Sequence, residues 1–215
     1  MKLTAIKPLV SNPHVYSVVV DNQYLGNISS QDVAELGLSI GSDLNPDSLD
    51  DLSRRINRLK YFRAAQRYAD RRIRSKKEVR QYLLLKGCEP KLANAIVERL
   101  SSGGLIDDSS FTSAYIHDSL LKKPLSKRAI KHKLKTKGVD EKIVEQSLAD
   151  ADYDENRALD QMIERKQGLS QYADNQPKLF RYLMSQGFSY ESIAKRIGRP
   201  QVSGRNRGGN STARD

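Results

Sequence analysis

Residues 74–87, RSKKEVRQYLLLKG, are the first of three related stretches on which the fold depends. The second is residues 126–138, SKRAIKHKLKTKG, and the third is residues 175–187, NQPKLFRYLMSQG. When the stretches are aligned on their final glycines, they recur at intervals of 51 and 49 residues. Such a period is typical of helical-repeat proteins. The sequence therefore predicts three copies of one structural unit.

Each stretch has the features of a short helix with a defined beginning and end. It starts with a residue that can cap a helix N-terminus, and Ser75 with Glu78 forms a capping-box pattern. Apolar residues follow in an i, i+4 pair, which lies on one face of a helix. The glycine then suits the C′ position, because positive φ brings no Cβ clash there. The caps are Ser75, Ser126 and Asn175, and the apolar pairs are Val79/Leu83, Ile130/Leu134 and Leu179/Leu183.

Two further helices complete each unit. A second short helix follows each glycine, with the apolar pairs Ala93/Val97, Val144/Leu148 and Ile193/Ile197. A third helix is expected over residues 61–72, 108–121 and 154–166. Asp107 and Asp108 are predicted to cap the second of these, and Asp152 with Asp154 the third. We therefore predict a mainly α fold with three tandem three-helix repeats, nine short helices in residues 60–197, that form an elongated curved domain.

The segment before the repeats has a different character. Residues 15–20 are β-branched and aromatic, and a turn at residues 21–23 precedes a returning strand at residues 24–28. We expect a further strand over residues 2–6, ended by Pro8, and a short helix over residues 30–36. A helix from residue 47 either continues into the first repeat or bends near residue 61. The predicted parts are 1–45 (small α/β segment), 46–60 (connecting helix), 61–101, 107–150 and 152–198 (repeats 1 to 3) and 199–215 (flexible basic tail).

Four motifs connect these repeats with a known family. They are R-S-x-x-E-V-R-x-Y-L-x-x-K-G at 74–87, G-L-I-D-D-x-x-F at 104–111, K-x-K-G-V at 135–139 and Q-G-F-S-Y-x-x-I at 186–193. Together they closely resemble the RecX family of bacterial regulatory proteins, over about residues 60–197. Gln186 departs from the family pattern, which usually has a basic residue there.

The resemblance implies a function as well as a fold. It implies a regulator that lodges in the helical groove of the RecA–DNA filament and modulates the recombinase and its ATPase, with inhibition as the expected sign. It places the protein in DNA repair, DNA recombination and the SOS response. Capping the filament, blocking its groove and stabilising it would all use a basic surface, so the sequence leaves both the sign and the mode of regulation open.

The charge distribution points to an anionic partner. The chain carries a formal net charge of +11, yet residues 1–53 contain two lysines and seven carboxylates. The positive charge is therefore concentrated in the repeats, where it follows helical spacing on faces opposite the apolar pairs. The predicted partner- or DNA-binding residues are Arg63, Arg67, Arg71, Arg74, Lys76, Lys77, Arg80, Lys127, Arg128, Lys131 and Lys135. RecA and the RecA–DNA filament are the expected partners, with weak non-specific DNA contact besides.

Other functions have less support. Residues 187–198 resemble the first part of a helix-turn-helix, so a DNA-binding protein acting without a recombinase is the alternative. Its recognition helix would have to come from the Gly- and polar-rich residues 199–215. The sequence contains no nucleophile–base group, no phosphate-binding loop and no metal-ligand spacing among His14, His117 and His132. We expect a cytoplasmic monomer that is not an enzyme, with no catalytic residue, cofactor, metal or membrane contact.

Overall fold

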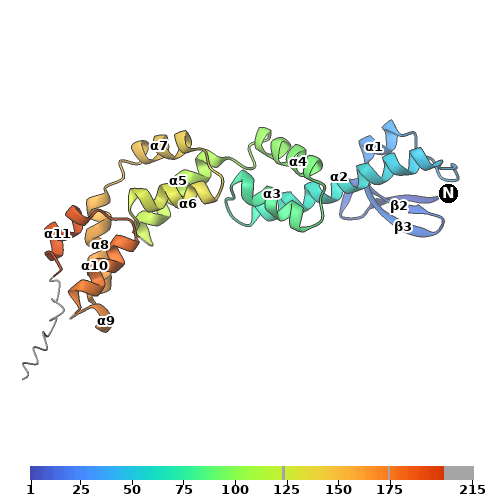
Figure 1. The fold of residues 1–215 in the computed structure, drawn as a ribbon. Helices are drawn as coiled ribbons and strands as arrows, with labels where there is room; N and C mark the ends of the chain where they lie inside the picture. Colours follow the sequence, from blue (N-terminus) through green and yellow to red (C-terminus); the bar gives the residue numbers. More distant parts are fainter. Residues whose placement is uncertain (123, 174, 201–215) are drawn as a thin grey trace, which may run out of the picture. The chain divides into compact units, whose positions relative to one another are not determined.

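The structure is a computed structural model that describes residues 1–122, 124–173 and 175–200 (Figure 1). It is mainly helical, with one three-stranded sheet at the N-terminus. The chain divides into two compact units. The first is Met1–Phe111 with Lys137–Val139, and the second is Thr112–Thr136 with the described residues from Asp140 onward. No helix of the described chain combines the length and the apolar character needed to cross a membrane.

The N-terminal sheet is an antiparallel meander of β1 (Leu3–Leu9), β2 (Asn12–Val20) and β3 (Gln23–Ser29). The turn between β2 and β3 has positive φ at Asp21 and Asn22, as a tight hairpin with right-handed twist requires. The sequence predicted that this first strand would end at Pro8, but β1 extends past it. It continues to Leu9, with Pro8 paired to Tyr16, because a proline is tolerated on an edge strand.

One face of this sheet packs on α2 (Pro46–Asp70). Buried apolar residues of the sheet meet Leu52 and Ile56 of the helix. Gly26 of β3 makes the approach close, since a Cβ at this position would lie 2.3 Å from Cγ2 of Ile56. A short helix, α1 (Ser30–Glu35), connects the sheet with the loop that leads to α2, and the side chain of its N-cap Ser29 accepts from the backbone N–H of Asp32.

α2 is one helix of 25 residues that passes through the predicted boundary between residues 60 and 61. Asn45 caps its N-terminus and Pro46 occupies the first turn. Its first half packs on the sheet, while Ala65 and Ala69 of its second half pack into the core of repeat 1. The connecting helix and the first helix of repeat 1 are therefore a single element.

Repeat 1 adds α3 (Lys76–Leu85) and α4 (Pro90–Ser102) to the end of α2. The predicted pairs Val79/Leu83 and Ala93/Val97 are all buried, at 5% exposure or less. The capping box at Ser75 is present, and Gly87 follows the helix with φ +81°. The predictions for this repeat's short helices are confirmed.

The remaining helices follow the same plan. They are α5 (Asp108–Leu121), α6 (Lys127–Thr136), α7 (Glu141–Asp150), α8 (Glu155–Gln167), α9 (Ser170–Ala173), α10 (Gln176–Ser185) and α11 (Tyr190–Ile197). The predicted apolar pairs Ile130/Leu134 of α6 and Leu179/Leu183 of α10 are buried. The glycines at 138 and 187, which follow these helices, have φ +80° and +87°. Ile197 is only partly buried. The described part of residues 60–197 contains ten helices instead of the predicted nine, because the single-turn α9 has no counterpart in the other repeats.

Partly buried hydrogen bonds attach the cap of α3 to distant residues of the first unit. Ser75 accepts from the N–H of Glu78 and donates from its own Oγ to the carbonyl of Lys137, at 2.8 Å. The N–H of Lys76 donates to Oδ1 of Asp108 at 2.9 Å, and Nζ of Lys137 lies 2.8 Å from Oε1 of Glu78. We call this group the first cap joint. Asp108 therefore caps α3, whereas the sequence suggested that it caps α5, and Asp107 alone caps α5 through the N–H of Ser110.

The second unit contains an equivalent second cap joint. Ser126 accepts from the N–H of Ala129, and its Oγ donates to the carbonyl of Gln186 at 2.8 Å. The N–H of Lys127 donates to Oε1 of Glu155 at 3.1 Å. The ion pair of the first joint has no equivalent here, because Ala129 stands in the place of Glu78 and Gln186 in the place of Lys137. Both serines are fully buried.

The cap of α8 also differs from the prediction. Asp154 accepts from the N–H groups of Asn156 and Arg157, as expected for an N-cap. Asp152, predicted to share this role, instead adopts a left-handed conformation with φ +44° in the turn after α7. The predicted basic tail lies outside the described residues from residue 201 onward.

Candidate partner-binding surface

The second half of α2, together with its C-cap residue Arg71, presents a row of unpaired cations. Arg63, Arg67 and Arg71 follow one another at intervals of four residues, and none of their side chains has a hydrogen bond or ion pair within the described chain. Arg67 and Arg71 are exposed and Arg63 is half-buried. Ala65 and Ala69 turn to the core from the same helix, which leaves the arginines on its outer side. We call Arg63, Arg67 and Arg71 the α2 cation row.

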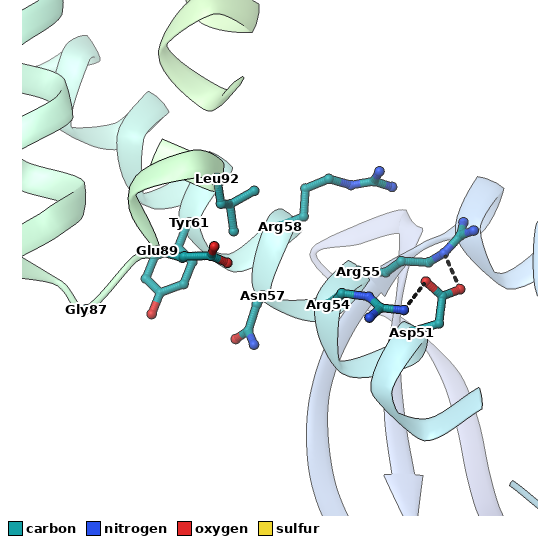
Figure 2. Close-up of a pocket in the computed structure, with 9 residues that line it drawn as sticks. All are labelled: Asp51, Arg54, Arg55, Asn57, Arg58, Tyr61, Gly87, Glu89 and Leu92. Carbon is teal, nitrogen blue, oxygen red and sulfur yellow. Dashed lines mark hydrogen bonds and ion pairs between the residues drawn. The ribbon is translucent and has the colours of Figure 1, made fainter. Parts of the chain in front are cut away.

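Other arginines at the start of α2 are already neutralised. Arg54, Arg55 and Arg58 line a cavity of about 480 Å³ (Figure 2). Asp51 pairs with both Arg54 and Arg55, and Arg55 also lies 2.6 Å from Glu35. Hydrogen bonds to Glu35, Asp32 and Asp51 raise the pKa of Arg55. This cavity therefore has little net charge to offer a ligand, in contrast to the α2 cation row.

Arg74, the fourth predicted arginine, has a structural contact. Its guanidinium lies 4.0 Å from the centroid of the Tyr68 ring, which in turn stacks on Tyr82 with a centroid distance of 4.1 Å. Nε of Arg74 is shielded from solvent and has no hydrogen-bond partner among the described residues. Both tyrosines are half-buried and form the layer beneath Arg74. Such a stack orders the α2–α3 turn.

The cations of α3 serve the fold to different degrees. Lys77 extends its side chain over Gly138, where an added Cβ would lie 2.5 Å from Cδ of the lysine. Nε of Arg80 donates to Oδ1 of Asn94 at 2.7 Å, which links α3 to α4. Lys76 stands beside the carboxylates of Asp107 and Asp108. The α3 cations are consequently less available to a partner than those of α2.

The predicted cations of α6 also divide into two groups. Nζ of Lys131 lies 2.6 Å from Oε1 of Glu145, and this hydrogen bond raises the pKa of the lysine. Lys127, Arg128 and Lys135 are exposed, and no hydrogen bond or ion pair engages their side chains in the described chain. The side chain of Lys127 shares a small cavity with Asp154 and Glu155. Arg128 and Lys135 are thus the clearest unpaired cations of α6.

Asp107 and Asp108, the adjacent carboxylates of the G-L-I-D-D motif, both accept backbone hydrogen bonds. The bond from Ser110 lowers the pKa of Asp107. Burial raises the pKa of Asp108, although the N–H of Lys76 works against this shift. Each carboxylate caps a different helix, so the geometry gives this pair a structural role.

Two contributors to the surface were missed from the sequence. Lys60 lies one turn before Arg63 and lines the same cavity as Arg63 and Arg67. Its i, i+3 spacing to Arg63 was a sufficient signal for its inclusion. Tyr24 of β3 lines this cavity too, and no sequence pattern could have shown that the hairpin reaches α2.

Comparisons with known proteins agree with this architecture. The sequence model described as "RecX, first three-helix domain" matches residues 62–100, and the model for the second three-helix domain matches residues 107–148. A regulatory protein RecX from Clostridium beijerinckii is 27% identical over 203 residues, which cover 91% of this chain and 94% of that protein. One from Lactobacillus johnsonii is 27% identical over 82% of this chain and 66% of its own length.

Solved structures show the same fold. A crystal structure of a regulatory protein RecX has a TM-score of 0.67 at 16% identity and covers 91% of this chain and 98% of its own. The crystal structure of RecX from Lactobacillus salivarius has a TM-score of 0.51 at 25% identity, over 65% of this chain and 93% of its own.

These findings define the class of protein and then the family. The fold and the capped three-helix repeats are those of a helical-repeat regulatory protein. The chain belongs to the RecX family.

Proposed function

We propose that this protein binds the RecA recombinase filament on DNA and inhibits its recombinase and ATPase activities. The α2 cation row is the observation that carries the proposal. Its arginines repel one another along one helix face, and no carboxylate of the described chain relieves that repulsion through an ion pair. Phosphates or carboxylates of a partner would supply the missing countercharge.

The mode of action is binding without chemistry of its own. A filament of recombinase on DNA offers both protein carboxylates and phosphates along a groove. Arginine is suited to both, because its planar donors bind carboxylate and phosphate in a bidentate manner. Arg63, Arg67 and Arg71 would provide such contacts from α2, and Lys127, Arg128, Lys131 and Lys135 further ones from α6. Glu145 competes for Lys131, so we expect its contribution to be the smallest of these.

The test compares three binding partners at one fixed salt concentration. Purified protein is titrated against bare DNA, against free RecA and against the assembled RecA–DNA filament. We expect the tightest binding to the filament, a fall in recombinase ATP turnover at saturation, and affinity that decreases steeply with salt. Equal affinity for bare DNA and for the filament, with unchanged ATP turnover, would instead support a DNA-binding protein that acts without a recombinase.

A further inference from the structure

A second cavity, of about 400 Å³, lies in the first unit where β3 meets α2. Tyr24, Leu25, Gly26 and Asn27 line it from the strand, and the helix contributes Ile56, Asn57, Leu59, Lys60, Arg63 and Arg67. We call it the β3–α2 groove. The absence of a side chain at Gly26 allows the strand to approach Ile56 and so closes the floor of the groove.

The charged residues that line the groove are all positive. The lining includes three cations and no carboxylate. Three other cavities of the described chain are lined by acids as well as cations. Their acidic residues are Asp51 and Glu89 in the first, Asp154 and Glu155 in the second, and Asp160 and Glu191 in the third. Arg63 and Arg67 have no ion pair within the described chain. Nζ of Lys60 lies 5.3 Å from the centroid of the Tyr61 ring. The groove therefore favours a ligand with several negative charges.

The strand side of the groove adds apolar surface and a free strand edge. β3 ends the sheet, so one side of its backbone has no neighbouring strand in the described chain. Tyr24 is 64% exposed and Leu25, at a register shift of the strand, is 38% exposed. A ligand that fits this side needs apolar groups and, at the free edge of β3, backbone hydrogen-bonding groups.

These requirements distinguish two classes of anionic partner. A nucleic acid offers phosphates together with bases that stack, but Tyr24 is the one aromatic ring in the lining of this groove, where strand-binding surfaces use successive aromatic residues. A polypeptide provides backbone N–H donors, apolar side chains and carboxylates in alternation along one extended segment. Recognition of extended peptides along the edge of a sheet is a recurring mode of binding.

We propose that the β3–α2 groove binds an extended acidic segment of a partner polypeptide. Its carboxylates pair with Lys60, Arg63 and Arg67, while its apolar side chains cover Tyr24 and Leu25. The proposal goes beyond regulation of the recombinase, because it gives the N-terminal sheet a direct part in binding and requires no nucleic acid.

The experiment uses the full-length protein and short fluorescent probes. The first probe is a peptide that alternates glutamate with valine, the second has glutamine in place of glutamate, and the third is an oligothymidylate of equal length. Fluorescence anisotropy reports binding. We expect the acidic peptide to bind at least about tenfold more tightly than its glutamine counterpart, because several charge pairs are lost together.

Matched variants locate the site. Arg63→Gln with Arg67→Gln should weaken binding of the acidic peptide about tenfold. Lys91→Gln with Lys142→Gln removes the same charge from exposed positions outside the proposed surface and should leave the affinity unchanged. Tyr24→Ala keeps every charge and should weaken binding several-fold through lost apolar contact. Circular dichroism verifies that each variant keeps its helical content.

Several results would overturn the proposal. An equal loss of peptide affinity in the Arg63/Arg67 variant and in its charge-matched control would show that the peptide is held by non-specific charge attraction. Displacement of the peptide by oligothymidylate with the same sensitivity to Arg63 and Arg67 would assign the groove to nucleic acid. Failure of the peptide to bind a protein that still binds the RecA–DNA filament would refute the groove proposal alone. Peptide binding without filament binding would support the groove and refute the proposed function.

Discussion

The two cap joints have the same backbone arrangement but different electrostatics. In each joint a buried serine caps its own helix and donates to the carbonyl that precedes the next repeat's glycine. The first joint adds an ion pair between Glu78 and Lys137, and the second has Ala129 and Gln186 at these positions. The second joint therefore has neither the basic nor the acidic residue of the first.

The comparison of the two joints distinguishes the residues that both of them share from the ion pair that only the first one has. A serine cap and a glycine occur in both joints, so they are the parts that the geometry requires. The Glu78–Lys137 pair is an addition, and the half-buried position of Glu78 keeps water from screening it fully. Gln186 therefore departs from the family pattern without disturbing the fold.

The largest predicted effects on stability come from substitutions in the hydrophobic cores. Repeats 1 and 2 should lose a similar free energy of unfolding there. Leu83 and Leu134 are both fully buried at equivalent positions. Leu83→Ala and Leu134→Ala should each lower the free energy of unfolding by about 2–5 kcal/mol, through lost burial and the cavity that remains. Urea denaturation followed by circular dichroism measures both. A negligible change at either position would contradict the repeat architecture.

Substitution by alanine should destabilise the fold more at Gly187, in the second cap joint, than at Gly87 of repeat 1. Gly87 and Gly187 both have positive φ, so alanine at either position is strained by about 1–2 kcal/mol. At Gly187 a Cβ would also lie 2.5 Å from Oγ of Ser126 and displace its hydrogen bond to Gln186. At Gly87 the nearest atom is 3.8 Å away. Gly187→Ala should therefore cost about 1 kcal/mol more than Gly87→Ala, and equal costs would argue against the close contact at the joint.

The ion pair is tested by exchanging residues between the joints. Lys137→Gln gives the first joint the residue of the second, and Glu78→Ala with Lys137→Gln reproduces the second joint's pair. A double-mutant cycle should show a coupling of about 0.5–1 kcal/mol. Ala129→Glu with Gln186→Lys should install a similar coupling in the second joint. Zero coupling in the first joint would mean that the pair contributes nothing to stability.

The smallest effect concerns pH. Burial of Glu78 opposes its charged form, but the hydrogen bond and charge of Lys137 outweigh this and hold its pKa below the ordinary value. A carboxyl with a lowered pKa stabilises the fold above its unfolded pKa and loses this contribution as pH falls through its folded pKa. Below about pH 5, wild-type stability should therefore decline more steeply than that of Lys137→Gln. Parallel decline of the two proteins would contradict this assignment.

The features that sequence patterns predicted are those determined within a few residues. Caps, i, i+4 apolar pairs and helix-ending glycines depend on neighbours in the chain, and Ser75, Leu83 and Gly87 behave as predicted. The continuity of α2 was left open because it depends on packing of one helix against both the sheet and repeat 1. Local patterns contain no information about that packing.

The binding surface was predicted less completely for the same reason. Helical spacing identified the α2 cation row, but it could not show that Arg74 covers Tyr68 or that Lys131 pairs with Glu145. The second hydrogen bond of Ser75 reaches a residue 62 positions away. Such contacts arise only after folding, so the sequence named more binding candidates than the structure leaves unpaired.

The most direct test of the proposed function is the affinity for the assembled RecA–DNA filament after charge reversal on α2. The test protein carries Arg63→Glu, Arg67→Glu and Arg71→Glu. A matched control carries Lys91→Glu, Lys142→Glu and Lys195→Glu, which change the same charge at exposed positions outside the proposed surface. We predict wild-type helical content in both, a loss of filament affinity greater than about tenfold in the α2 variant, and near wild-type affinity in the control. Normal filament binding by the α2 variant would contradict the account.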